Sequence, residues 1–323
     1  MWEQQPVSIT HFQDASLMYD WNQVPPLTCQ FVRPEQVELN DETLRDGLQC
    51  PSVLQPSLEQ KQAFLRLLPR LGIGSADIGY GGASTSALED VVVLAKTIVA
   101  EKLPIAPNCA GRTHEADIKP ILEAQQRSGL AIEAALFIGS SPIRQLVEGW
   151  DVSYLLRTIE AAVSYARGHG LTVMFVTEDT TRAQPEHLTG MYLTAARCGA
   201  TRLCLADTVG HATPTGVQRL VLFLREQLQH AGFGDLALDW HGHRDRGLDV
   251  VNSLAALSAG AGRVHGCALG IGERVGNTAM DTLLVNLVLL GWMEQDLTAL
   301  QAYCRLACEM TSMPIAHNYC HLK

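Results

Sequence analysis

From residue 37 onward, short apolar and β-branched runs alternate with longer segments in which apolar residues recur at helical spacing. The strand-like runs begin near residues 37, 75, 104, 131, 171, 201, 236 and 263. Segments of helical periodicity follow them, for example 58–71, 86–102, 152–168 and 214–229. Gly, Pro, Ser or Asp residues join the two kinds of segment. The pattern predicts eight consecutive strand–helix pairs.

Such alternation is typical of an α/β protein with a parallel sheet and right-handed crossovers. Eight pairs over residues 37–290 match the roughly 250 residues of a closed (β/α)8 TIM barrel. An open, doubly wound sheet is the alternative, but the chain has no spare strand and no insertion large enough for a second domain. We therefore expect an N-terminal extension over 1–36, a catalytic barrel over 37–290 and a C-terminal tail over 291–323. One amphipathic helix is predicted in that tail, over 296–310.

Composition narrows the class of protein. Of the 323 residues, 47% are hydrophobic and 18% are charged, which excludes a disordered chain. The net charge is −10 without a basic cluster, so we expect no nucleic-acid partner. No basic leader and no apolar run of about 18 residues occurs, which predicts a cytoplasmic protein without membrane contact. Nine scattered Cys residues without a CxxC pair indicate neither a disulfide framework nor a thiolate zinc site.

In a barrel of this kind, catalytic residues come from the C-terminal ends of the strands. His241 and His243 end the seventh predicted strand, and their spacing places both imidazoles on one face. The first strand ends near Asp46 and the eighth near Asn277, and closure makes strands seven, eight and one neighbours. These four side chains are therefore predicted to converge on a mixed nitrogen and oxygen site for a divalent metal. A structural histidine pair and, for Arg45 with Asp46, a surface ion pair are the alternatives.

Polar residues also stand at the tips of strands five and six. Glu178 and Thr208 occupy those tips and are candidate functional residues. Helix N-capping is the competing explanation, and it suffices for Thr181 and Thr213. The glycine-rich run GIGERVG does not fit a dinucleotide fingerprint, because its third glycine, Gly276, comes one position late and the run follows the eighth strand.

Five motifs in this order resemble the DRE-TIM metallolyase superfamily: ETLRDGLQ, EDTTR, DTVGHATP, HGHRDRG and GIGERVGN. Within it, the chain is most similar to the branch of 2-isopropylmalate, homocitrate and citramalate synthases. The resemblance covers residues 37 to about 290. It implies a Claisen-type condensation of an acyl-CoA, expected to be acetyl-CoA, with a 2-oxo acid, giving a 2-substituted malate and CoA in amino-acid biosynthesis. It also favours a homodimer.

The resemblance further implies roles for individual residues. Asp46, His241 and His243 would hold Mg2+, Mn2+ or Zn2+, with Asn277 at or beside the metal. Arg45 would act catalytically by stabilising a developing enolate or alkoxide. Glu178 would organise the water or the thioester end of the substrate. The substrate-binding residues would be Gln49 and Thr208 for the oxo acid, Gly272 and Glu273 for the acyl-CoA, and Arg112.

The chain also departs from the synthase pattern. Arg244 stands where Asn is usual, beside the second His, and Arg144 stands where His is frequent. The synthases continue into further helical subdomains that supply a basic His, for which His317 and His321 are weak substitutes. These features leave open a second reading, a metal-dependent hydroxyacyl-CoA lyase or aldolase that resembles 3-hydroxy-3-methylglutaryl-CoA lyase, with Cys267 near the lyases' reactive Cys. A noncatalytic descendant would have lost the metal ligands, and all four are present.

Overall fold

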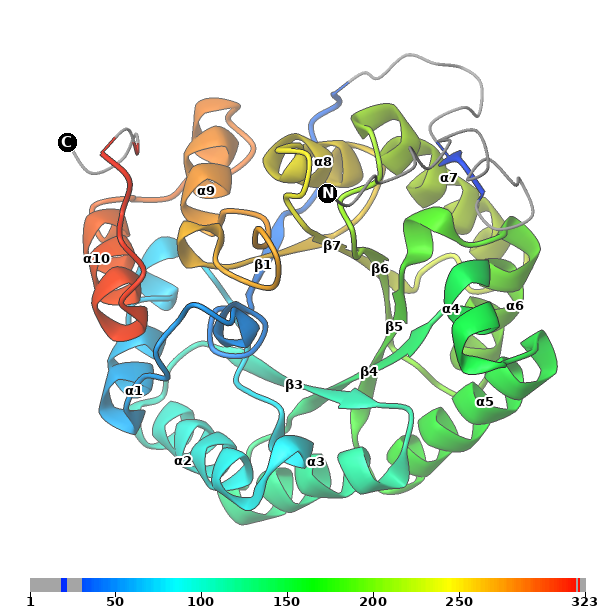
Figure 1. Ribbon diagram of the computed structural model, residues 1–323, viewed down its shortest axis with the longest axis horizontal. Coiled ribbons are helices and arrows are strands. Elements are labelled where there is room, and N and C mark those ends of the chain that lie inside the picture. Colours follow the sequence, from blue (N-terminus) through cyan, green and yellow to red (C-terminus); the bar gives the residue numbers. More distant parts are fainter. Residues whose placement is uncertain (1–18, 22–30, 318, 320–323) are drawn as a thin grey trace, which may run out of the picture.

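The computed structural model describes residues 19–21, 31–317 and 319, and these residues build a closed barrel of parallel strands inside a ring of helices (Figure 1). The strands pair in sequence order from β1 to β8, and β8 closes onto β1 with Glu38 opposite Arg263. The predicted (β/α)8 fold is thereby confirmed. The strands are β1 (Glu38–Asp41), β2 (Ser75–Asp77), β3 (Ala106–Arg112), β4 (Glu133–Gly139), β5 (Thr172–Glu178), β6 (Arg202–Asp207), β7 (Ala237–Gly242) and β8 (Arg263–Gly266).

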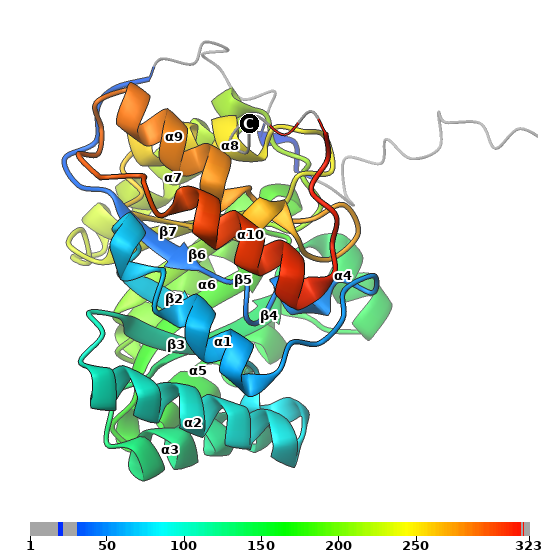
Figure 2. The same cartoon turned by 90° about the vertical axis from the view of Figure 1, so that its left-hand side faces the viewer.

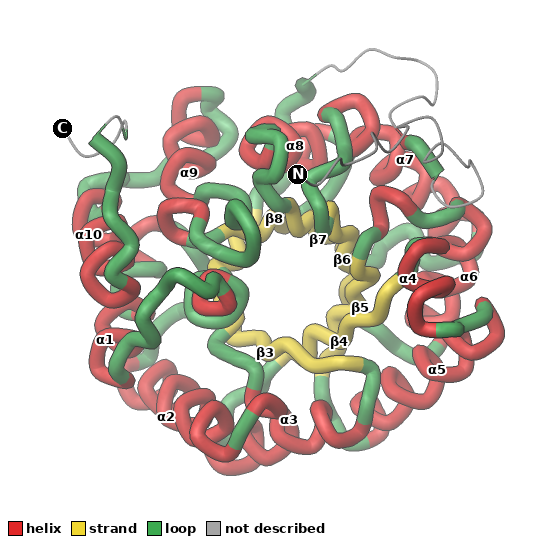
Figure 3. Tube along the Cα trace, in the orientation of Figure 1, coloured by secondary structure: helices red, strands yellow, loops and turns green. Residues whose placement is uncertain are grey.

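Helices surround the strands on the outside, as the tube view shows (Figure 3). They are α1 (Leu58–Leu65), α2 (Thr85–Glu101), α3 (Glu115–Ser128), α4 (Pro142–Glu148), α5 (Val152–Gly168), α6 (Pro185–Arg197), α7 (Pro214–His230), α8 (Asp249–Ser258), α9 (Met280–Leu289) and α10 (Leu300–Thr311). None of these helices, within the described part of the chain, has both the length and the apolar character needed to cross a membrane.

Two helices differ from the sequence pattern for local reasons. The segment 58–71 was expected to be one helix, but α1 ends at Leu65 and a 3-10 turn over Pro69–Leu71 follows. Proline has no N–H and cannot continue the helical ladder at residue 69. Between β4 and β5 the chain forms α4 as well as the expected α5. Gly149 ends α4 at a positive φ of 69°, and Asp151 then caps α5 by accepting a hydrogen bond from Tyr154 N.

The C-terminal helix α10 packs against α1 beside the barrel (Figure 2). The rings of Phe64 and Tyr303 lie 5.0 Å apart, and Tyr303 OH donates to the buried carboxylate of Asp41 at the end of β1. The predicted tail helix therefore exists, shifted to Leu300–Thr311. Most of the predicted N-terminal extension lies outside the described residues. Within it, Trp21 is buried, and the centre of its ring lies 5.0 Å from the centre of the Phe223 ring on α7.

Polar side chains fill the end of the barrel interior where the strands begin, although branched aliphatic residues are usual in this fold. Arg263 at the start of β8 reaches across the interior to Glu133 at the start of β4 at 2.7 Å and to Ser75 on β2 at 3.1 Å. Nearer the C-terminal mouth, Ala135, Met174 and Cys204 form a small apolar cluster with Val176 packed on it. The two levels are in contact, because Arg263 Nη2 lies 3.2 Å from Met174 Sδ.

Candidate active site

The loop after β1 places an arginine and an aspartate at the C-terminal mouth of the barrel. Arg45 Nε donates to Asp77 Oδ2 at 2.8 Å, and its other nitrogens lie 3.5 Å from Glu42 Oε1 and 3.6 Å from Asp46 Oδ2. Gly47 N–H donates to the carbonyl of Glu42 at 3.0 Å, which closes the turn. Three carboxylates therefore hold the guanidinium, whose side chain is 17% exposed and lines the cavity at this mouth.

β7 directs His241 and His243 into the barrel, close to Asp46. Their Nε2 atoms are 3.0 Å apart. Asp46 Oδ2 lies 3.3 Å from Nε2 of His241 and 3.9 Å from Nε2 of His243. All three side chains are nearly buried, and together they form a group whose ligand atoms could share one ion. The structure thus brings together three residues that lie on two distant stretches of the sequence.

Asn277 joins this group from the loop after β8. An isolated backbone bridge pairs it with His243, and its Nδ2 donates to Cys267 Sγ and to the carbonyl of Ile271, each at 3.2 Å. Its Oδ1 is buried and has no hydrogen-bond partner among the described residues. A buried acceptor without a donor is costly. One carboxylate, two imidazoles and this free oxygen are a donor set that fits a divalent cation of the Mg2+, Mn2+ or Zn2+ type.

The two imidazoles differ in their protonation. Burial disfavours a charged His241, but the carboxylates of Glu42 and Asp46 outweigh burial and raise its pKa to about 10. Burial and the neighbouring His241 lower the pKa of His243 to about 4, so its ring is neutral at pH 7. For Asp46, burial is outweighed by Arg45 and His241, which lower its pKa to about 2. A bound cation would therefore replace one proton, the proton on His241.

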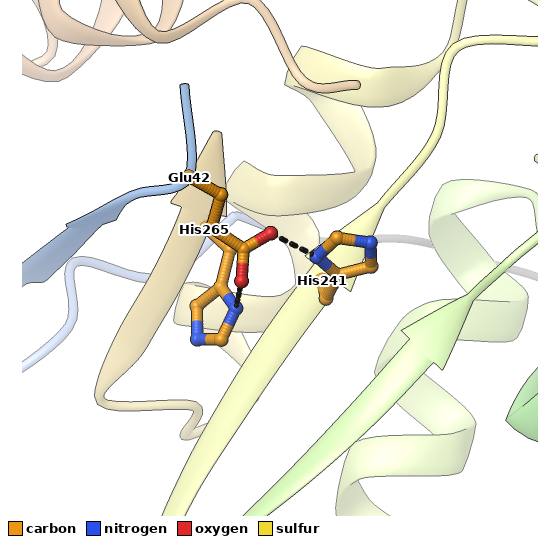
Figure 4. A group of neighbouring side chains, drawn as sticks. All are labelled: Glu42, His241 and His265. Atoms are coloured by element: carbon orange, nitrogen blue, oxygen red, sulfur yellow. Dashed lines mark hydrogen bonds and ion pairs between the residues drawn. The ribbon is translucent and has the colours of Figure 1, made fainter. Parts of the chain in front are cut away.

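Sequence reasoning missed the carboxylate behind this pair. Glu42 lies between two imidazoles (Figure 4), with Oε2 2.7 Å from His241 Nδ1 and Oε1 2.9 Å from His265 Nδ1. His265 Nε2 in turn lies 2.9 Å from Asp239 Oδ2. Strand alternation could have found both carboxylates, because Glu42 continues the inward parity of β1 and Asp239 is two residues before His241. The charge of these two residues, taken alone, would instead have suggested exposed positions.

The other polar candidates line the same cavity, whose volume is about 270 Å³. They are Gln49, Glu178, Thr208 and Glu273. Thr208 Oγ1 accepts a hydrogen bond of 2.8 Å from Asp179 N, which leaves its own hydrogen to donate elsewhere. Burial raises the pKa of Glu178, while Arg144, 4.0 Å away, opposes that rise.

Two expected substrate contacts take different positions. Arg112 ends β3, but its side chain is 58% exposed, binds Asp117 at 2.7 Å and does not line the cavity. Gly272 is also absent from the described cavity wall and serves the neighbouring Asn277 instead, because a Cβ on residue 272 would meet Asn277 Nδ2 at 2.3 Å. The loop can approach the amide only if residue 272 is glycine.

The residues that depart from the synthase pattern lie around the site rather than in it. Arg244 turns toward the loop after β8, donating to the carbonyl of Leu269 at 3.4 Å. Arg144 lies over the ring of Trp150 at 6.0 Å and 3.3 Å from Glu148. His317 is exposed and outside the cavity, while His321 falls outside the described residues.

Cys267 is buried, and burial raises the pKa of its thiol well above the usual range. That shift disfavours a reactive thiolate at this position.

Comparisons with known proteins agree with this geometry. The model of the HMGL-like family matches residues 36–307. A 2-isopropylmalate synthase of Sediminispirochaeta smaragdinae is 34% identical over 79% of this chain and 49% of its own length. A putative (R)-citramalate synthase of Methanopyrus kandleri is 34% identical over 78% of this chain and 47% of its own. The chain thus spans about half the length of these relatives. The HMG-CoA lyase of Bacillus subtilis shares the fold, with a TM-score of 0.72 at 22% identity, over 88% of this chain and 97% of the lyase.

Proposed function

We propose, from the premise that this chain belongs to the HMGL-like family, that it is a metal-dependent enzyme joining an acyl-CoA to a 2-oxo acid. The products are a 2-substituted malate and free CoA, and acetyl-CoA is the expected acyl donor. One observation carries the proposal: Asp46, His241 and His243 converge beside Arg45 in a single cavity at the C-terminal mouth of the barrel. The synthases among the relatives support the direction of the reaction.

The cation site is formed by Asp46, His241, His243 and the free oxygen of Asn277. A divalent cation bound there supplies Lewis-acid polarisation of the keto group of the oxo acid. Because these ligands come from β7 and from the loops after β1 and β8, the barrel itself fixes their spacing. The rest of the chemistry falls to side chains of the same cavity.

Arg45 stabilises the charge that develops in the condensation. The α-carbon of the thioester loses a proton to a base, and its electron pair forms a bond to the keto carbon. The electron pair of the C=O bond moves to oxygen, which then takes up a proton. The guanidinium is held by Asp77 at 2.8 Å, so it is oriented before the charge appears. Such fixed donors are among the largest contributors to catalysis in buried sites.

Thr208, Gln49 and Glu178 handle the remaining groups. Thr208 uses its free hydrogen, and Gln49 its amide, to bind the carboxylate of the oxo acid. The raised pKa of Glu178 suits it to take a proton from the water that attacks the thioester in the second step. The oxygen of the water bonds to the thioester carbon, the C–S bond breaks, and the proton taken by Glu178 passes to the sulfur, so that CoA leaves as the free thiol.

An activity panel tests the proposal. Chelator-treated protein is incubated with acetyl-CoA and one of pyruvate, 2-oxoisovalerate, 2-oxoglutarate or oxaloacetate, with and without Mn2+ or Mg2+, and free thiol is followed. We expect thiol release with at least one oxo acid only when metal is added. The variant His243→Ala should lose at least 100-fold in rate, whereas His230→Ala, on the exposed end of α7, should keep the wild-type rate.

Two outcomes would contradict this function. Full activity of the chelated protein or of His243→Ala would remove the metal from the mechanism. No thiol release with any oxo acid, together with cleavage of a hydroxyacyl-CoA, would instead assign the lyase reaction to the same site.

A further inference from the structure

The cavity at the barrel mouth is lined by two chemically different walls. The wall from β7, β8 and β1 carries His241, His265 and Glu42. The opposite wall, from β3 to β6, is apolar up to the ends of the strands, where Glu178 and Thr208 stand near the mouth. Its main members are Ala110, Ala135, Phe137, Met174, Val176 and Cys204. A substrate whose oxygens face the candidate metal ligands therefore presents its far end to apolar side chains.

The apolar wall also forms one side of the inner end of the cavity, and the other side is formed by His265 and Glu42, each 2% exposed. Three members of the apolar wall are at most 4% exposed: Ala135, Met174 and Cys204. Val176 follows Met174 by two residues on β5 and therefore lies nearer the mouth. The CoA part of the thioester is too large for a cavity of about 270 Å³, so when bound it must extend out of the cavity through the mouth. The closed inner end is then left for the side chain of the oxo acid.

No Lys or Arg that lines the described part of the cavity is free for a second carboxylate; Arg144, outside the lining, lies 4.0 Å from Glu178 and 3.3 Å from Glu148. Among its described lining residues Arg45 is the only Lys or Arg, and Asp77 already binds it at 2.8 Å. Four carboxylates line the same space: Glu42, Asp46, Glu178 and Glu273. A buried charge without a partner is strongly disfavoured, and acidic neighbours add to the penalty.

We infer that this site selects monocarboxylic 2-oxo acids with aliphatic side chains and rejects dicarboxylic ones. The inference rests on the proposed function for the orientation of the oxo acid, whose two oxygens face Asp46, His241 and His243. The side chain of the oxo acid packs against Ala135, and the small residue there leaves room for a branched chain.

Direct binding tests the selection without turnover. Oxo acids are titrated into Mn2+-loaded protein by calorimetry, with pyruvate as reference. Two additional buried carbons contribute about 0.8 kcal/mol each, so 2-oxoisovalerate should bind roughly tenfold tighter than pyruvate. Binding of 2-oxoglutarate should be weaker than that of pyruvate. Binding of 2-oxoglutarate or oxaloacetate as tight as that of 2-oxoisovalerate would overturn the inference.

Substitutions on the wall give a sharper test. Val176→Arg supplies the missing cation and should tighten 2-oxoglutarate binding at least tenfold over Val176→Gln, its uncharged control. Equal affinities in these two variants would count against the inference. Ala135→Leu fills the inner end and should weaken 2-oxoisovalerate at least fivefold more than pyruvate, and an equal loss for both acids would contradict the assigned side-chain position.

These measurements separate the two proposals. The expected order of affinities without thiol release from acetyl-CoA would preserve the selectivity and refute the synthase reaction. Thiol release with 2-oxoglutarate as the best substrate would preserve the synthase reaction and refute the selectivity.

Discussion

Replacing Glu42 with Gln tests whether the buried carboxylate tunes the candidate metal site. The substitution keeps the size of the side chain and removes its charge. The carboxylate faces Nδ1 of both His241 and His265, at 2.7 and 2.9 Å. An amide has one acceptor oxygen, so one imidazole must face an N–H group instead. Losing the partner that orients a metal-binding imidazole typically costs 10- to 100-fold in affinity, or about 1.4 to 2.7 kcal/mol.

Calorimetric titration of Mn2+ into chelator-treated protein measures this change directly, with urea unfolding as a check on the fold. The matched control is Glu38→Gln, which removes a carboxylate from the same inward face of β1 but 3.1 Å from Arg202 rather than beside the imidazoles. We expect the control to bind Mn2+ within twofold of wild type. Wild-type affinity in Glu42→Gln, or an equal loss in Glu38→Gln, would refute the reasoning.

Two further predictions concern the support of the site. Burial raises the pKa of Asp41 to about 6, although Tyr303 donates to it, so the protonated form is favoured in the folded state. Between pH 3.8 and 6 the unfolded chain releases this proton while the folded chain keeps it, so the free energy of unfolding of the wild type falls as pH rises. Asp41→Asn has no such proton, so in urea unfolding its free energy of unfolding should rise relative to that of the wild type by up to about 3 kcal/mol from pH 4 to pH 7. The same pH dependence of stability in both proteins would contradict the shift. Gly272→Ala should weaken Mn2+ binding at least tenfold in calorimetry, because the new Cβ displaces the side chain of Asn277. The control Gly168→Ala, which has open space around its Cβ, should leave Mn2+ binding unchanged. The same Mn2+ affinity in both variants would show that the position of the Asn277 amide does not matter for metal binding.

The sequence predicted the barrel and the meeting of Asp46 with His241 and His243, because both follow from regular geometry. Strand alternation places residues 241 and 243 on one face, and ring closure makes the ends of β7, β8 and β1 neighbours. Their role as metal ligands stays a prediction. The role of Arg112 as a substrate contact also stays a prediction. Asp117, five residues later, binds its guanidinium at 2.7 Å, and only the fold of the loop reveals that contact.

The helix boundaries were also only partly accessible. Hydrophobic periodicity gave α5 within its observed bounds, Val152–Gly168, since its apolar stripe is regular and Asp151 caps its start. α4 has no buried residue, so it offered no periodic signal. Its existence depends on Ser141 and Gly149 at its two ends rather than on a hydrophobic face.

The charged groups inside the barrel were the part of the fold that the sequence predicted least. Burying them costs free energy of folding, and this cost points to a role in the candidate site. Burial opposes a charged His265, but Glu42 and Asp239 outweigh it and raise its pKa, so anion and cation alternate from Glu42 through His265 and Asp239 to Arg263. Aliphatic residues of equal volume in such positions are often neutral or stabilising, so stability alone gives little reason for the series. Its outer end contacts His241 Nδ1, which leaves Nε2 toward Asp46 and His243. The series therefore lowers the stability of the fold in exchange for a fixed orientation of the His241 imidazole. For this reason Glu42→Gln, which replaces one oxygen by an NH2 group, should weaken metal binding.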